Sequence, residues 1–525
     1  MSTTDSAQDA HDSTLTVDSV SLTLGTDSLL IMTALPVQAV GVVVYSTQVR
    51  QTKQLHRPVP HPLSRALIGA NLRCTCISSD LGSLIAPQTT HAISLYNVLG
   101  AEVTASNIVI AYAKPTGKDD VAVATVQYPI VEKEKKAVEA WVGKLVDQAY
   151  GKALRGKRLK VLINPFGGKG YAADLYHRYA APVFAAAKCQ VDVQSTEHRG
   201  HAIDIAENLD VDAFDAVVCC SGDGLPYEVF NGLGKRPDAR TALIKTAVAL
   251  LPCGSGNGLT WNAFGTGSVS IAALAIVKGF RTPLDLVSIS QKDSRTLSFL
   301  SQSFGIVAES DLATENIRWM GAQRFTYGFL VRLMRQTIWP CDLSVKVEID
   351  DKEAIKDHYA TWSTRSEESD VDTKRLEAAA QSPLLPELKY GSVSDDVPSD
   401  WQVVPGETMG NFYAGNMAIM SKDTNMFPAT LPNDGLLDVI TIDGRVSRGT
   451  ALSMMNEIPS GRFFDMPELI IRKASAFRLV PHQKEGYISI DGERVPFEAF
   501  QAEVHQGLGT IITKSGRLYE AEGPR

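Results

Sequence analysis

The sequence predicts an α/β fold in three parts: a three-layer domain with a parallel sheet, a mainly antiparallel β-sandwich after it, and a small β-rich domain before it. Three observations lead to this prediction. The 525 residues are too many for a single hydrophobic core. Residues 160–264 repeat a strand, a glycine-rich turn and a helix four times, which is typical of parallel sheets. Short apolar strands separated by turn residues dominate before residue 130 and after residue 284.

The composition indicates a soluble globular chain that does not bind nucleic acid in bulk. It has 51 Lys and Arg against 59 Asp and Glu, a net charge of −8, and 44% of its residues are hydrophobic. The seven cysteines are odd in number and sparse, which favours reduced thiols and a cytosolic compartment. Cys74 and Cys76 are either alternating strand residues, the favoured interpretation, or acylation sites.

Shifts in composition divide the chain further. Residues 352–400 are acidic, serine-rich and poor in apolar spacing, which predicts a disordered insertion. The apolar windows 28–45 and 268–280 are interrupted or too short to cross a bilayer, and the N-terminus lacks the pattern of a secretory signal. The expected parts are a disordered tail (1–17), a β-rich domain (18–130), a linking amphipathic helix (131–150), the α/β domain (151–284) and the β-sandwich (285–525).

Four glycine-rich turns follow the strands of the predicted parallel sheet. Because the carboxyl ends of parallel strands meet at one edge, free N–H groups and helix N-termini gather there and favour a polyphosphate ligand. Asp223 stands between two glycines in one of these turns, where it is either a functional acid or a capping residue, and we expect the glycines to leave room for ligand. The turns are "NPFGGKG" (164–170), "STEHRGHA" (195–202), "SGDG" (221–224) and "PCGSGNG" (252–258).

Two common nucleotide motifs are absent. The nearest match to a Walker A motif, "GKALRGKR", ends in Arg158 and precedes a strand, whereas a Walker A motif follows one. The spacing in "GSGNG" does not fit the Rossmann fingerprint. A nucleotide would therefore bind by a third design.

The turns "INPFGGKG", "SGDGLPYEVFNGL" and "LPCGSGNGL" resemble the signature turns of the diacylglycerol kinase catalytic domain superfamily. Together with "FGIVAESDLATENIRWMGAQRFTYG", "DGLLDVITI" and "ISIDGERV", the set is similar to sphingosine (long-chain base) kinases from about residue 158 to the C-terminus, except in the acidic insertion. The N-terminal region resembles the pleckstrin-homology-like portion of fungal and plant relatives.

The resemblance implies an enzyme that uses ATP and Mg²⁺ to phosphorylate the primary hydroxyl of sphingoid bases such as sphingosine, sphinganine and phytosphingosine. A diacylglycerol or ceramide kinase of the same superfamily is the alternative, and a catalytically silent nucleotide-binding scaffold is a third interpretation. In all three cases the α/β domain binds the nucleotide, and in the first two the β-sandwich binds the lipid.

The resemblance also implies roles for particular residues, with Asp223 as the general base and no metal ligand assigned. Arg318 and Arg324 could instead be a solvated face, Asp491 a type I′ hairpin turn, and Glu309 competes with Asp311 for the amine of the substrate. The implied substrate contacts are Ser221, Gly222, Gly224 and Asp311. The implied nucleotide contacts are Asn164, Pro165, Phe166, Thr196, Glu197, His198, Arg199, Gly200, Glu228, Gly254, Ser255, Arg318, Arg324, Asp491, Gly492 and Glu493.

A lipid tail requires an apolar pocket, and residues 325–340 offer a broad apolar face with Arg332 and Arg335 at its fringe. This segment could line the pocket, dock to a membrane surface, bind a calmodulin-like partner, or be an ordinary core helix. We expect a cytoplasmic protein that associates peripherally with intracellular or plasma membranes. The apolar face comprises Phe325, Phe329, Leu330, Leu333, Met334, Ile338 and Trp339.

Overall fold

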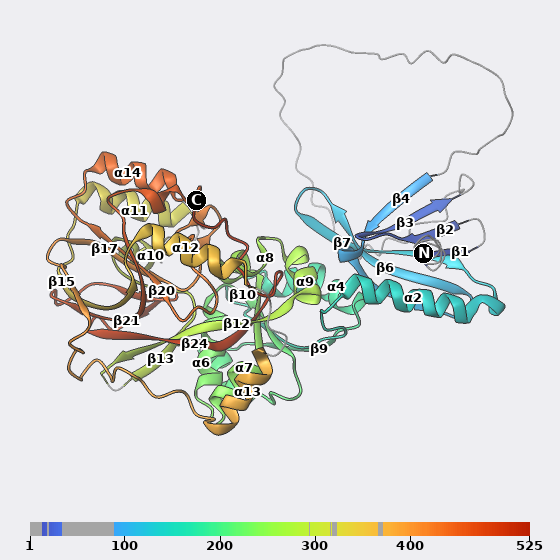
Figure 1. Ribbon diagram of the computed structural model, residues 1–525, viewed down its shortest axis with the longest axis horizontal. Helices are drawn as coiled ribbons and strands as arrows, with labels where there is room; N and C mark the ends of the chain where they lie inside the picture. Colours follow the sequence, from blue (N-terminus) through green and yellow to red (C-terminus); the bar gives the residue numbers. More distant parts are fainter. Residues whose placement is uncertain are drawn as a thin grey trace, which may run out of the picture. The chain divides into compact units, whose positions relative to one another are not determined.

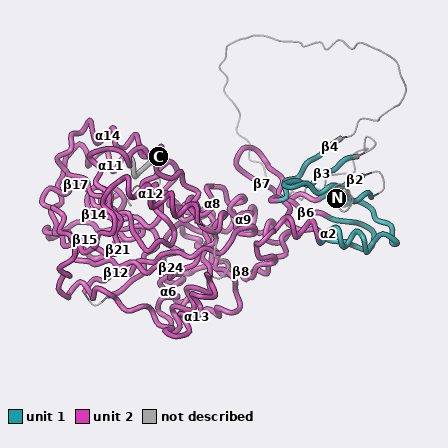
Figure 2. The backbone as a smooth tube through the Cα atoms, in the orientation of Figure 1, with its two compact units in different colours: residues 1–95, 102–109, 126–143 teal, residues 96–101, 110–125, 144–525 magenta. Residues whose placement is uncertain are grey.

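The computed structural model describes residues 13–17, 20–33, 89–292, 294–314, 317, 323–365 and 371–525, without the side chains of 323–326. These residues form two compact units (Figure 2): the first comprises 1–95, 102–109 and 126–143, and the second comprises 96–101, 110–125 and 144–525. Cys74, Cys76, the first 12 residues and Arg318 lie outside the described residues.

The N-terminal region is rich in β-structure, as predicted. Strands β1 (Thr14–Val17), β2 (Val20–Leu24), β3 (Ser28–Thr33) and β4 (Thr89–Ser94) form an antiparallel sheet in that order. The expected tail is wrong for 14–17, because alternate residues of β1 pack into this sheet. Strands β5 (Val98–Val103), β6 (Asn107–Thr116) and β7 (Asp120–Pro129) form a second sheet. The predicted helix follows as α2 (Lys135–Tyr150).

The parallel layer is formed as the glycine-turn rhythm predicts. Strands β9 (Gln190–Ser195), β8 (Arg158–Ile163), β10 (Ala216–Ser221) and β11 (Ala247–Pro252) lie side by side in that order, all parallel. Each of these strands is followed by helical segments: α3 (Ala172–Leu175), a π-helical turn (Tyr176–Ala180) and α4 (Ala181–Ala186) after β8; α5 (His201–Glu207) after β9; α6 (Gly224–Gly234) and α7 (Ala239–Lys245) after β10; α8 (Gly258–Phe264) and α9 (Val269–Lys278) after β11.

One strand joins the parallel layer to the antiparallel part. Strand β24 (Phe500–Thr513) pairs in parallel with β11 and antiparallel with β12 (Phe280–Gln291) and β21 (Ile470–Pro481). The sheet therefore continues without a break from the parallel strands into the β-sandwich, and β24 is labelled between β12 and the helices α6 and α7 in Figure 1. The expected boundary between the α/β domain and the β-sandwich, at residue 284, falls inside β12, so this strand belongs to both parts.

The remaining strands complete the mainly antiparallel part. The order β23–β22–β14–β17–β20–β21 leads from a short hairpin to the junction with β24. A core that includes Phe304, Phe412, Phe477 and Phe500 fills this part. The strands are β13 (Ser294–Ser298), β14 (Ser301–Gly305), β15 (Cys341–Ile349), β16 (Gln402–Val404), β17 (Met409–Gly415), β18 (Ile419–Ser421), β19 (Thr424–Asn425), β20 (Leu437–Asp443), β22 (Ile488–Ile490) and β23 (Glu493–Val495), and the helices α10 (Ile306–Leu312), α11 (Gln323–Arg335) and α14 (Arg448–Glu457).

The predicted disordered insertion is wrong for 352–365 and 371–400. Helices α12 (Lys352–Ser363) and α13 (Val371–Gln381) form there, and each buries a single apolar side chain completely, Ile355 and Ala379. Polar anchors hold the segment: Arg375 donates from Nε to the Gly507 carbonyl at 2.9 Å and from Nη2 to the Gly509 carbonyl at 2.6 Å. Because so few apolar residues hold this segment, its sequence shows no hydrophobic periodicity that would predict the two helices.

No single helix in the described ranges is long and apolar enough to cross a membrane, although α8 and α9, bent by 53°, meet the criterion of length and composition as a pair.

Candidate active site

Three turns at the carboxyl edge of the parallel sheet pack backbone against backbone. A Cβ on Gly222 would lie 2.5 Å from the Gly256 carbonyl oxygen, and a Cβ on Gly254 would lie 2.3 Å from the Gly222 nitrogen. Gly168, with φ of +59°, would place a Cβ 2.8 Å from the Cys253 carbonyl oxygen. Real Cβ atoms do not come this close to backbone atoms, so the approach of the turns to one another requires these glycines; the expected room for ligand stays a prediction.

Asp223 lies between β10 and α6 with its carboxylate at the N-terminus of α8. Its Oδ2 accepts a hydrogen bond from the Gly258 N–H at 2.7 Å, and its Oδ1 accepts one from the Leu259 N–H at 3.0 Å. Burial raises the pKa of Asp223 to about 6, and the two N–H donors limit that rise. The Asp223 side chain does not cap α6, the helix that follows it in the chain. It accepts hydrogen bonds from the first residues of α8 instead, so it caps a helix from another part of the chain.

The loops that the resemblance assigns to the nucleotide are held at the same edge. Asn164 Oδ1 accepts from the Phe166 N–H at 2.9 Å, and the Phe166 ring is 76% exposed. Glu228 on α6 accepts from the N–H groups of Gly200 at 3.0 Å and Ala202 at 3.1 Å, so this acid fastens the start of α5. The same turns include Pro165, Thr196, Glu197, His198 and Ser255.

The hairpin of β22 and β23 reaches the turns of the parallel sheet. Glu493, the first residue of β23, forms an ion pair with Arg199 from the turn between β9 and α5. A Cβ on Gly224 would lie 3.2 Å from Glu493 Oε1, so the acid passes directly over the start of α6. The Ser221 hydroxyl donates to the Gly222 carbonyl at 2.7 Å. These contacts bring Glu493, Arg199 and the start of α6 together at the edge of the parallel sheet.

Asp491 holds this hairpin in place. Its Oδ1 accepts from the Ser298 hydroxyl at 2.6 Å and from the N–H groups of Leu300 and Ser301 at 3.0 and 2.8 Å, and its Oδ2 accepts from the Phe299 N–H at 2.8 Å. Four donors occupy the carboxylate. Burial nevertheless raises its pKa to about 6.

The backbone of the β22–β23 hairpin forms the type I′ turn that was the alternative interpretation of Asp491. Asp491 and Gly492 both have positive φ, 52° and 81°, and Ile490 pairs with Glu493 across them, as in a type I′ turn. With its carboxylate already occupied, Asp491 acts on the site by positioning Glu493.

Of the two acids in "AESD", the structure separates Asp311 from Glu309. Glu309 Oε2 accepts from Arg332 Nε at 3.1 Å, and its Oε1 accepts from Trp339 Nε1 at 3.1 Å, so this carboxylate ties α10 to α11. Asp311 faces the hairpin, where its Oδ2 accepts from the Ser489 hydroxyl at 3.4 Å. Glu309 is therefore held between α10 and α11, whereas Asp311 lies next to the β22–β23 hairpin, and the role of Asp311 stays a prediction.

Tyr413 is a site residue that the sequence interpretation missed. It lies on β17, is buried, and its hydroxyl bonds to the Ser301 side chain. Burial raises the pKa of Tyr413, and the negative charges of Asp311, Asp491 and Asp223 raise it further, so its hydroxyl is within electrostatic reach of all three acids. The only signal in the sequence is a polar group at a position of β17 that alternation places opposite the core residue Phe412.

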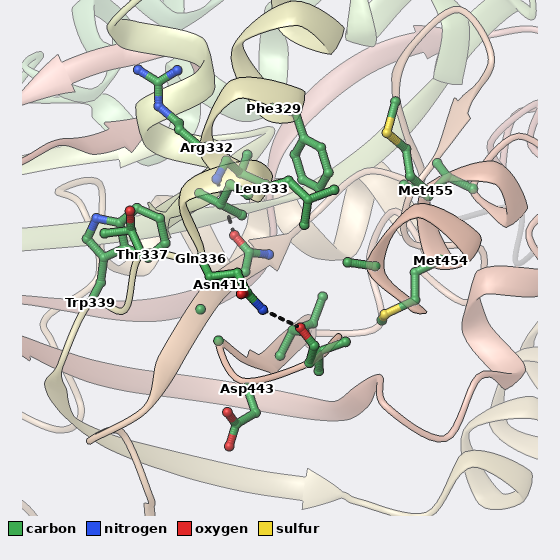
Figure 3. A pocket seen from close by; sticks show the side chains of 18 of the residues that line it. Phe329, Arg332, Leu333, Gln336, Thr337, Trp339, Asn411, Asp443, Met454 and Met455 are labelled. Atoms are coloured by element: carbon green, nitrogen blue, oxygen red, sulfur yellow. Dashed lines mark hydrogen bonds between the residues drawn. The ribbon is translucent and has the colours of Figure 1, made fainter. Parts of the chain in front are cut away.

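A pocket lined mainly by apolar residues lies between α10, α11, α14 and strands β17 and β20. Figure 3 shows Phe329 and Leu333 of α11 on one side and Met454 and Met455 of α14 on the other. Ile306 and Val307, at the start of α10, also line it, which brings the pocket to within one helical turn of Asp311. Of the expected apolar face, Phe329, Leu333, Ile338 and Trp339 turn inward to different degrees, whereas Leu330 and Met334 are exposed.

Two of the expected phosphate contacts are the arginines Arg318 and Arg324. Arg318 lies outside the described residues, and the Arg324 side chain is not described although α11 includes the residue, so both roles stay predictions. Within the described ranges, no cluster of three or more His, Cys, Asp or Glu side chains could hold a metal ion.

Glycine turns at the edge of a parallel sheet with a buried acid among them suit a kinase, because such turns bind phosphates. Residues 158–289 match the diacylglycerol kinase catalytic domain family, and residues 390–512 match the YegS C-terminal NAD kinase beta sandwich-like domain. Residues 13–151 match a family described as a domain of unknown function.

Curated relatives are more specific. Sphingoid long chain base kinase 5 of Saccharomyces cerevisiae is 31% identical over 79% of this chain and 68% of its own, and sphingoid long chain base kinase 4 of Schizosaccharomyces pombe is 34% identical over 77% and 86%. Sphingosine kinase 1 of Homo sapiens is 29% identical over 68% and 91%. The chain belongs to the family of sphingoid long-chain base kinases, and like other kinases of that family it uses ATP.

The position of Asp223 predicts an acid limb in the pH profile. With a pKa of about 6, the carboxyl is ionised at pH 7 and becomes protonated as the pH falls through 6, when it can no longer accept a proton. We expect kcat/KM to fall about tenfold per unit below pH 6, and Asp223→Asn to lose at least about a hundredfold at pH 7.5. The measurement is initial rate against pH from 5 to 8, with thermal stability recorded at each pH. A rate that stays level down to pH 5 in folded enzyme contradicts this role.

Proposed function

We propose that this protein transfers the γ-phosphoryl group of ATP to the primary hydroxyl of sphingoid long-chain bases, giving the 1-phosphate. The observation that carries the proposal is the pairing of two acids at one site. Asp223 lies among the glycine turns of the sheet, and Asp311 lies on α10, whose first turn lines the apolar pocket. A single ligand with a hydroxyl, an amine and an alkyl chain in that order meets all three features.

Asp223 and the glycine turns have different roles in the phosphoryl transfer. The oxygen of the primary hydroxyl attacks the γ-phosphorus, the bond from phosphorus to the β–γ bridging oxygen breaks, and ADP leaves. The hydroxyl proton passes to Asp223, whose orientation is fixed by the Gly258 and Leu259 N–H groups. The N–H groups of the glycine turns hold the phosphates. Mg²⁺ on the phosphates would neutralise part of their charge, and the carboxylates nearest to the turns are those able to hold it.

Asp311 selects the class of lipid. A carboxylate at the site stabilises the ammonium of a sphingoid base, because a charged amine that leaves water needs an opposite charge or strong acceptors. Diacylglycerol has no amine, and in ceramide the nitrogen is an uncharged amide, so neither makes this ion pair. Glu309 does not substitute for Asp311, because Arg332 and Trp339 already occupy it.

We also propose that the face of α11 and α14 outside the pocket rests on a membrane surface. Tyr327, Leu330 and Met334 of α11 are 54%, 37% and 60% exposed, and Leu452 of α14 is 40% exposed. Arg448 of α14 donates from Nη2 to the Met334 carbonyl at 3.0 Å, so a cation stands beside the apolar residues. Exposed apolar side chains next to cations are typical of peripheral binding to anionic bilayers.

This surface favours a membrane over a calmodulin-like partner. A partner that encloses an amphipathic helix takes its largest apolar residues, whereas Phe329, Leu333 and Trp339 are engaged in the pocket. We propose that the protein is cytoplasmic and binds peripherally to intracellular or plasma membranes; a pocket beneath α11 supports this, because the substrate resides in the bilayer.

The substrate proposal predicts the outcome of a radiolabelled ATP assay on sphinganine, phytosphingosine, ceramide and diacylglycerol. We expect transfer to the two free bases and at least a hundredfold lower kcat/KM on the two amine-free lipids, because only the bases pair with Asp311. Asp311→Asn should lower kcat/KM on sphinganine by at least about thirtyfold and leave ATP binding intact. Transfer to diacylglycerol at a comparable rate, or an Asp311→Asn variant with unchanged efficiency, contradicts the assignment.

The membrane proposal predicts that Leu330→Ser with Met334→Ser weakens sedimentation with vesicles of phosphatidylcholine and phosphatidylserine by at least about fivefold, because both apolar side chains leave the bilayer interface. Leu384→Ser is the matched control, since Leu384 is 61% exposed on a different segment. Equal sedimentation of the double variant, the control and the wild type excludes this face.

A further inference from the structure

Three neighbouring strands carry a row of hydroxyl groups beside Asp311. Ser489 on β22 pairs directly with Ser303 on β14, and Ser303 pairs directly with Tyr413 on β17. Residues paired in this way point to the same face of a sheet. The Ser489 hydroxyl donates to Asp311, which identifies that face as the one toward α10. We call Ser489, Ser303 and Tyr413 the hydroxyl row; all three side chains are buried.

The hydroxyl row lies between the acids and the apolar pocket. Two residues before Ser303 on β14 is Ser301, whose N–H donates to Asp491. Two residues after it is Gly305, which pairs with Asn411, a residue that lines the pocket (Figure 3). At about 3.3 Å per residue along a strand, the row is about 7 Å from each end of this path. A ligand that extends from the acids into the pocket passes over it.

The chemistry of the row suits a hydroxyl of the ligand. The Tyr413 ring is fixed by an edge contact with Phe427, with 5.0 Å between ring centroids, and its hydroxyl bonds to Ser301 and can still accept. Ser303 lies opposite Tyr413 on the same face of the sheet and is 3% exposed. The row therefore offers hydroxyl groups next to a pocket that is lined mainly by apolar side chains.

We propose that Tyr413, together with Ser303, binds the 4-hydroxyl of a sphingoid base and so makes the enzyme efficient on 4-hydroxylated bases. The inference rests on the proposed function, because Asp223 and Asp311 fix the primary hydroxyl and the 2-amino group and thereby direct the next carbons over the row. The alkyl chain then enters the pocket lined by Phe329 and Leu333.

The test compares phytosphingosine, which has the 4-hydroxyl, with sphinganine, which lacks it. For Tyr413→Phe, we expect the ratio of kcat/KM on phytosphingosine to kcat/KM on sphinganine to fall about tenfold, mainly through KM, because only phytosphingosine loses a hydrogen bond. The ring contact with Phe427 is retained in this variant. Tyr390→Phe, on a segment away from the site, is the matched control and should leave the ratio as in the wild type.

A fall of at least threefold in the ratio supports the inference, and any smaller change overturns it. An equal loss on both bases is such a case, because it assigns the phenol to the hydroxyl that both bases share or to packing alone. The proposed function is separable: if the wild type uses both bases and the ratio does not move, only this inference fails. If the wild type phosphorylates neither base, both fail.

A measurement on the wild type covers the case in which Tyr413→Phe does not fold. The inhibition constants of 1-deoxy bases with and without a 4-hydroxyl report binding of the chain without phosphoryl transfer. With a partner for the hydroxyl, the two constants should agree within about threefold or favour the hydroxylated compound. A hydroxylated compound that binds about tenfold or more weakly overturns the inference, because its hydroxyl would then be buried without a partner.

Discussion

The site depends on the contact between the turns after β10 and β11, where no atom larger than hydrogen fits at Gly222 or Gly254. Because the two backbones touch, the N-terminus of α8 comes to the end of β10, and its Gly258 and Leu259 N–H groups reach Asp223. Two backbone N–H groups thereby orient the acid. Its burial sets a pKa near neutrality, as a proton acceptor requires.

A second constraint connects this turn to the β-sandwich. Strand β24 continues the parallel sheet into the antiparallel strands, and Asp491 fastens the β22–β23 hairpin to the turn between β13 and β14. Glu493 then meets Arg199, and Ser489 meets Asp311. The nucleotide side and the lipid side of the site are therefore parts of one sheet, so the distance between phosphate and lipid head group is fixed by strand register.

The sequence predicted those parts of the fold that depend on local pattern. Glycine turns after apolar strands identified the parallel layer and Asp223, and short alternating strands identified the β-sandwich. The pattern did not reveal α12 and α13, because buried cations such as Arg375 and single apolar residues hold them. The sequence pattern also did not predict that Tyr413 lies at the site, because its position depends on the register between β14 and β17. It did not predict that Glu228 binds the start of α5, because that contact joins residues distant in the chain.

We propose above all that Asp223 and Asp311 bind two groups of one ligand, the primary hydroxyl and the ammonium. A crystal structure with a non-hydrolysable ATP analogue and a sphingoid base tests it most directly. The account predicts the primary oxygen within hydrogen-bonding distance of Asp223, the nitrogen at Asp311 and the alkyl chain against Phe329 and Leu333. A base whose nitrogen lies at Glu309, or whose chain lies outside that pocket, would contradict it.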